Sequence, residues 1–98
     1  MDVTKVMKGT ELVVAVEGRI DTTTAPELES ELKESCVEAE SLLLDFAKVD
    51  YISSAGLRVL LSLQKLTTKR GGMKLINVND DIMEIFEVTG FDDILTIE

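Results

Sequence analysis

The sequence predicts a small α/β domain built on a largely parallel sheet. Strand-like apolar segments alternate with amphipathic helical segments in the order β-β-α-β-α-β-α, an alternation typical of parallel sheets with right-handed crossovers. At 98 residues the chain holds one hydrophobic core, so we expect residues 1–98 to form a single domain. Leucine, valine and isoleucine must fill this core, because the chain has only three phenylalanines and one tyrosine and no tryptophan.

Two strands are expected at residues 2–8 and 11–17, on either side of a hairpin-like break at Lys8-Gly9-Thr10. The second, "ELVVAVEG", is an almost continuous apolar run. Such a run suits a strand that is covered on both faces.

The first helix has its start marked in the sequence. Thr24 and Glu27 match the capping-box pattern, and Pro26 falls in the first turn, where its missing N–H costs nothing. Leu28, Leu32 and Cys36 share one helical face and should be buried. We therefore assign Cys36, the only cysteine, a structural role in the core.

The remaining elements follow the same alternation. A strand is expected at 42–46 with Asp45 near its end, a helix from 55 to 69 closed by "RGG", and a strand in "MKLINV". Asn79-Asp80-Asp81 should cap a third helix that stops at Gly90, and "ILTI" suits a last short strand. The expected core comprises Leu12, Val14, Leu43, Leu60, Leu63, Ile76, Ile82 and Phe86.

Composition excludes several function classes. A net charge of −9 argues against nucleic acid or anionic lipid as a direct partner and favours a basic protein surface. The absence of histidine removes histidine-based catalysis and most zinc sites, so we expect no metal, no cofactor and no enzymatic activity. A single cysteine and the lack of a long apolar segment favour the cytoplasm and argue against membrane insertion.

The stretch "YISSAGLRVLL" at residues 51–61 is the most specific part of the chain. It brings Ser53 and Ser54 to the start of the second helix, where unpaired N–H groups and the helix dipole favour an anion. The two serines have two interpretations: one is ordinary helix capping, and the other is a phosphorylation site. Gly56 would leave room for the backbone or nucleotide of a partner to come close.

The segments "VEGRID", "PEL", "LLLDF", "VDYISSAGLRVLL", "GGMKLINV" and "VTGFDDIL" resemble, in order and spacing, the STAS family of anti-sigma factor antagonists. The resemblance covers nearly the whole chain. It implies a small α/β domain with a four- to five-stranded mixed sheet and helices packed largely on one side. It also implies a bacterial regulator that binds an anti-sigma factor, itself a serine kinase, and thereby releases a sigma factor.

One departure from the family motif concerns the phosphorylated residue. In the family that residue lies immediately before the glycine, and Ala55 occupies this place here. Ser54 is the expected acceptor from a shifted position, with Ser53 as the alternative; otherwise the protein is a member that never switches. The resemblance implies partner contacts by Asp21, Ser53, Ser54, Ala55, Gly56 and Leu57.

Three further features have two interpretations each. Asp21 either lies beside the phosphorylation loop to meet the partner or opens the threonine-rich turn. Asp45 either contacts a partner or binds loop N–H groups. The wide apolar arc of the second helix is either covered by its neighbours or left as a docking patch.

The leading hypothesis is therefore an anti-sigma factor antagonist, a monomer or weak dimer without catalytic activity. The alternative is a non-switching STAS subunit of a lipid-transport or stressosome-like assembly. A small enzyme is disfavoured, because no nucleophile–base pair can be built without histidine and no glycine-rich phosphate loop follows a strand.

Overall fold

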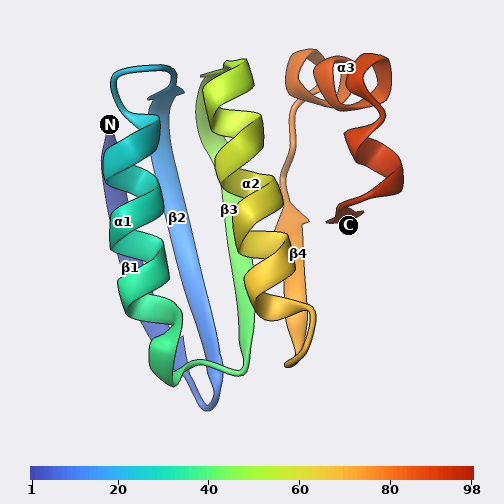
Figure 1. Cartoon of the computed structure of the whole chain (residues 1–98). Coiled ribbons are helices and arrows are strands. Elements are labelled where there is room, and N and C mark those ends of the chain that lie inside the picture. Colours follow the sequence, from blue (N-terminus) through green and yellow to red (C-terminus); the bar gives the residue numbers. More distant parts are fainter.

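A five-stranded mixed sheet forms the centre of the computed structural model, which describes residues 1–98 (Figure 1). The strands follow one another across the sheet in chain order, with β1 antiparallel to β2 and the other neighbours parallel. Their bounds are β1 Asp2–Lys8, β2 Glu11–Ile20, β3 Ser41–Ile52, β4 Gly72–Ile76 and β5 Thr96–Ile97. The predicted fold class and the order of elements are confirmed, including the turn at Gly9, whose φ is 64°.

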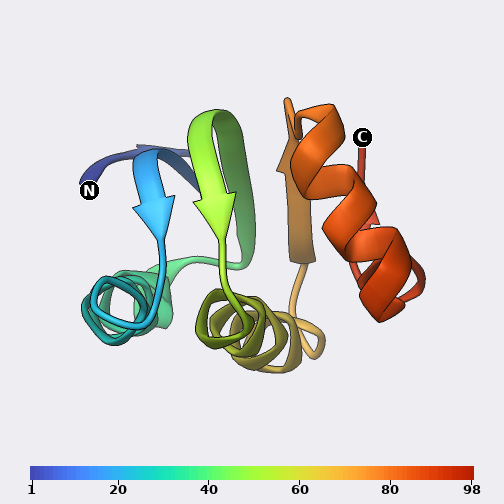
Figure 2. The same ribbon diagram turned by 90° about the horizontal axis from the view of Figure 1, so that it is seen from above.

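Two helices cover one face of the sheet, α1 (Ala25–Ser35) and α2 (Ser54–Thr67), as Figure 2 shows from above. The third, α3 (Asp80–Thr89), lies beyond β4 at the edge of the sheet. Short 3-10 turns follow α1 at Cys36–Glu38 and α3 at Phe91–Asp93. None of the helices is both long enough and apolar enough to cross a membrane.

Coverage of one face decides which apolar residues enter the core. Val14, Leu44 and Leu75 lie in one row of the sheet and are buried under the helices. Their chain neighbours point to the opposite, uncovered face. The core prediction holds for Leu12, Val14, Leu60, Leu63, Ile82 and Phe86, but it is wrong for Leu43 and Ile76, which are only half-buried.

The same one-sided packing corrects the expectation that β2 is covered on both faces. Val13 is half-buried and Ala15 is exposed, because no helix lies over them. Both central strands are also longer than expected. Two register shifts let β2 and β3 stay paired as far as Ile20 and Ile52, so "VDYI" belongs to the strand.

The end of α1 is fixed by contacts that join distant parts of the chain. Arg70 donates from Nη1 to the carbonyl oxygens of Cys36 at 2.6 Å and Ala39 at 3.0 Å, and Gly71 N–H donates to Glu40 at 2.6 Å. Cys36 is buried as predicted, and burial raises the pKa of its thiol. The "RGG" segment therefore binds the loop after α2 to the turn after α1. Helix α2 itself ends at Thr67, two residues earlier than expected.

The start and stop of α3 follow the sequence. The side-chain oxygen of Asn79 accepts the Ile82 N–H at 2.9 Å, and Gly90 adopts the left-handed conformation at φ 80°. Asn79 also donates from Nδ2 to the carbonyl of Val49 at 3.0 Å, which ties the start of α3 to β3.

Candidate functional site

The predicted site residues meet at the carboxyl ends of β2 and β3, at the top of Figure 1. Ile20 and Ile52 are paired there, and the Ser53 N–H donates to the Ile20 carbonyl at 2.8 Å. This bond holds the loop after β2 beside the first turn of α2. Crevices outside the carboxyl ends of strands are the usual position of binding sites in open α/β sheets.

Asp21 organises the loop between β2 and α1. Its Oδ1 accepts hydrogen bonds from the Thr23 N–H at 2.9 Å, the Thr23 hydroxyl at 2.7 Å and the Thr24 N–H at 3.1 Å. The bonds to Thr23, followed by the N–H of Thr24, lower the pKa of Asp21 from 3.8 to about 2. The interpretation of Asp21 as the residue that opens the turn is confirmed, and its partner contact stays a prediction.

The expected capping box of α1 is not formed. Thr24 makes no side-chain cap; its hydroxyl donates to the Arg19 carbonyl at 2.8 Å and accepts the Asp21 N–H at 2.9 Å. The Thr24 hydroxyl is therefore used to close the turn onto β2. The N–H of Thr24 donates to Oδ1 of Asp21, which lies four residues before the first residue of α1.

The lowered pKa of Asp21 predicts a specific dependence of stability on pH. A carboxylate with a depressed pKa stabilises the fold at pH values above about 4, and this contribution is lost as pH falls toward about 2. Asp21→Asn keeps an acceptor but cannot titrate. We expect the stability difference between wild type and Asp21→Asn to shrink as urea unfolding is repeated from about pH 6 down to about pH 2. Asp50→Asn, at an exposed aspartate of β3, serves as control, and a difference that is the same at every pH would contradict the assignment.

The two serines have different environments. Ser53 is the N-cap of α2, and its hydroxyl oxygen accepts the Gly56 N–H at a long 3.4 Å. Ser54 is the first residue of the helix, and its side chain is exposed. The capping function thus falls to Ser53, and Ser54 is the serine that solvent or a partner can reach.

Gly56 and Leu57 do not present a surface to a partner. A Cβ at position 56 would lie 2.6 Å from Cγ1 of Ile52 and 2.8 Å from Cγ2 of Ile20. Glycine is thus required for close packing of α2 onto the sheet, and the expectation that it leaves room for a partner is wrong. Leu57 is also buried in the core, and Ala55 is partly buried against it, so direct contacts from this turn fall to the serines.

Sequence reasoning missed a pair of residues beside this loop, Arg19 and Tyr51. They are neighbours in the β2–β3 ladder, and the guanidinium lies 4.4 Å from the centre of the tyrosine ring. Arg19 Nε also approaches Asp21 Oδ2 at 3.8 Å. Arg19 lies in the segment "VEGRID" and Tyr51 in "VDYISSAGLRVLL", but only the register of the parallel strands β2 and β3 reveals that the two side chains stack.

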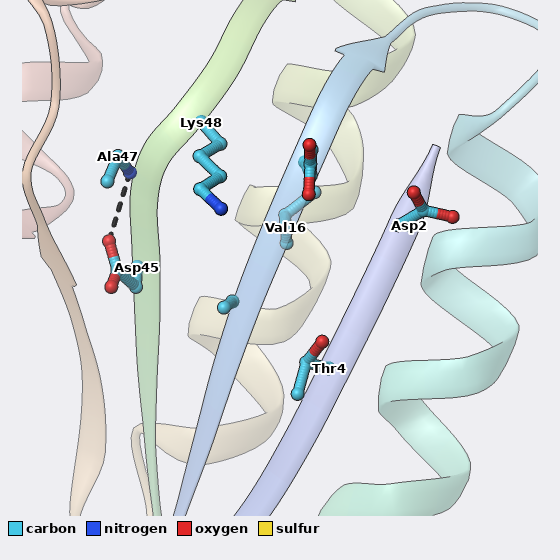
Figure 3. A pocket seen from close by; sticks show the side chains of 8 residues that line it. Asp2, Thr4, Val16, Asp45, Ala47 and Lys48 are labelled. Atoms are coloured by element: carbon cyan, nitrogen blue, oxygen red, sulfur yellow. Dashed lines mark hydrogen bonds between the residues drawn. The ribbon is translucent and has the colours of Figure 1, made fainter.

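Asp45 lies inside β3 and not at its end. Its Oδ1 accepts the Ala47 N–H and the Asn77 Nδ2–H, both at 3.0 Å. It borders a hollow of about 290 Å³ on the uncovered face of the sheet, which also includes Asp2, Thr4 and Lys48 (Figure 3). Asp45 thus accepts a backbone N–H, but the donor belongs to Ala47 of β3 and not to a loop as expected.

The apolar arc of α2 is mostly covered. Val59, Leu60 and Leu63 are buried, Leu61 is half-buried and Leu66 is 38% exposed. Since α1 and the sheet take up most of the arc, the interpretation of coverage by neighbours is confirmed for this helix, with Leu66 as the exception.

Comparison with known proteins places this arrangement in a family. The STAS domain matches residues 3–98. Over 82 residues the chain is 37% identical to the putative anti-sigma factor antagonist BtrV of Bordetella bronchiseptica, covering 82% of this chain and 71% of that protein. The anti-sigma-B factor antagonist of Bacillus subtilis is 32% identical over 88 residues, 89% of this chain and 81% of the relative.

Solved structures agree on the fold. The crystal structure of an anti-sigma factor antagonist from Mycobacterium paratuberculosis superposes with a TM-score of 0.88 over 98% of this chain and 83% of the other, at 24% identity. A match along nearly the full chain, together with curated relatives named as anti-sigma factor antagonists, shows that this chain belongs to the STAS domain family.

Proposed function

We propose that this protein is an anti-sigma factor antagonist, which binds an anti-sigma factor of the serine-kinase type and so releases a sigma factor. The observation that carries the proposal is that curated relatives of this function are 37% and 32% identical over more than four-fifths of the chain. The contact surface would be the Asp21 turn with Ser53 and Ser54, which the Ser53–Ile20 bond holds together.

Phosphorylation of Ser54 would control this complex. The Ser54 side chain is exposed at the first position of α2, where the N–H groups of the first turn have no intrahelical acceptor and the helix dipole favours negative charge. A phosphate would be held there without unfolding the domain. It would instead repel an acidic surface or a nucleotide phosphate of the partner, so the effect would fall on affinity.

Ser54→Asp is expected to weaken binding to the cognate anti-sigma factor by about tenfold or more, equivalent to 1.4 kcal/mol. Ser54→Ala should stay bound in the presence of kinase and ATP. Titration calorimetry measures the affinity, and intact mass after incubation with ATP reports the phosphate. Ser30→Asp, at an exposed serine of α1, adds the same charge away from the loop and should bind as wild type does.

Ser53 provides the second comparison. If Ser53 accepted the phosphate, Ser53→Ala and not Ser54→Ala would abolish the mass increase. Because Ser53 caps α2, its replacement should also cost about 1 kcal/mol of stability, which Ser54→Ala should not. A wild-type mass that stays unchanged with kinase and ATP, while the complex persists, would contradict the phosphate switch but not the antagonist.

A second candidate function rests on Ala55, which occupies the place of the usual phosphorylated residue and cannot accept a phosphate. The protein would then be a non-switching STAS subunit of a lipid-transport or stressosome-like assembly. Neighbouring genes distinguish the two functions, since a kinase or sigma factor beside this gene supports the antagonist and transporter subunits support the alternative.

A further inference from the structure

Helix α3 carries a buried apolar stripe and a second apolar side that is only partly covered by the core. Ile82 and Phe86 are fully buried. On another side of the helix, Ile85 is half-buried and packs against the edge of the core, whereas Val88 is 81% exposed, the highest value among the large apolar side chains that remain exposed. Val88 lies about 200° around the helix from Phe86, so it points away from the core.

This second side lies in a shallow groove of about 280 Å³, lined by Asp81, Glu84, Ile85, Val88 and Thr89. These residues follow the spacing i, i+3, i+4, i+7 and i+8, which defines one continuous face of a helix. In a soluble domain such a face is normally polar or covered. We call this face of α3 the outer α3 face.

The charge around the outer α3 face has a single sign. From Leu75 to the C-terminus the sequence contains seven aspartates and glutamates and neither lysine nor arginine. Asp81 and Glu84 border the apolar residues directly, and Glu87 precedes Val88. The last cation before this segment in the sequence, Lys74, approaches Glu98 at 3.4 Å.

We propose that the outer α3 face is a second docking surface, and that its occupant is a basic amphipathic helix of a partner protein. Leucine-like side chains of that helix would cover Val88 and Ile85, and its lysines or arginines would meet Asp81 and Glu84. Charge complementarity selects this occupant: anionic lipid and a second copy of the same acidic face would both be repelled. Apolar anchors within a ring of charges are the usual composition of a helix-binding groove.

The outer α3 face and the Asp21 turn lie toward opposite edges of the sheet. In Figures 1 and 2, α3 stands beyond β4, whereas the Asp21 turn leads into α1, with α2 between them. The proposal does not rest on the anti-sigma factor, and its test uses neither that protein nor a kinase.

The test uses a labelled peptide of leucine and lysine arranged at helical spacing, with a scrambled peptide of the same composition as the second probe. We expect the helical peptide to bind in fluorescence anisotropy, with amide shifts concentrated at Ile85, Val88 and Thr89 of the nitrogen-15-labelled protein. Val88→Asp should weaken this binding by about tenfold or more. Because Val88 is exposed, the variant should stay folded.

Val37→Asp is the matched control. Val37 is a valine 70% exposed in the turn after α1, so the variant adds the same charge at another exposed valine and should bind as wild type does. Equal binding of the scrambled peptide, equal weakening by both variants, or shifts that centre on another element would overturn the proposal. A monomer–dimer equilibrium in sedimentation that Val88→Asp abolishes would assign the face to a second copy and also overturn it.

Discussion

Gly56→Glu is expected to unfold the domain, and its loss of partner binding will follow from the loss of structure. The new Cβ would overlap Ile20 and Ile52, which are 0% and 2% exposed and cannot move aside. Overpacking of this kind costs about 1–3 kcal/mol, and an unpaired carboxylate forced into the core costs several more. Together these costs approach the whole free energy of unfolding of a small domain, about 5–15 kcal/mol.

Ser54→Glu is the control for this variant. It adds the same side chain two residues earlier, in the same helical turn, but at an exposed position. A negative charge at a helix N-terminus is favourable, so its free energy of unfolding should stay within about 0.5 kcal/mol of wild type. Circular dichroism and urea unfolding of both variants make the comparison. A folded Gly56→Glu that fails to bind would restore Gly56 to the contact surface.

Leu60→Ala is expected to lower the free energy of unfolding by about 2–5 kcal/mol. Leu60 of α2 is 1% exposed and belongs to the hydrophobic core, so truncation removes buried methyl groups and leaves a cavity. Urea denaturation followed by far-UV circular dichroism gives the value.

Leu66→Ala provides the comparison within the same helix. Leu66 is 38% exposed, so the same truncation removes fewer contacts and should cost clearly less. Two results would contradict the burial of Leu60 in the core of the domain. One is an equal loss of free energy of unfolding in both variants. The other is a free energy of unfolding of Leu60→Ala within a few tenths of a kcal/mol of wild type.

Local signals predicted the elements that depend on a few neighbouring residues. Gly9 marks the hairpin, and Asn79 and Gly90 mark the two ends of α3, because turn and cap geometries are made within four or five residues. The buried stripe of α1 was also predicted, since its helical spacing is a local property. The expected side-chain cap of α1 by Thr24 is not formed, because the Thr24 hydroxyl donates to the Arg19 carbonyl instead. This competing hydrogen bond is available only when β2 and the turn after it are in place.

By itself, the sequence determined the alternation of strands and helices, and hence the largely parallel sheet. The resemblance to the STAS family placed Asp21 beside Ser53 and Ser54. The tertiary structure alone decided which face of each strand and helix is covered. Leu43 and Ile76 have core-like side chains yet face the open side of the sheet, whereas Gly56, in the motif expected to meet a partner, is buried against Ile20 and Ile52. The physical reason is that burial depends on which elements pack over a face, and that packing is set by contacts between residues far apart in the chain.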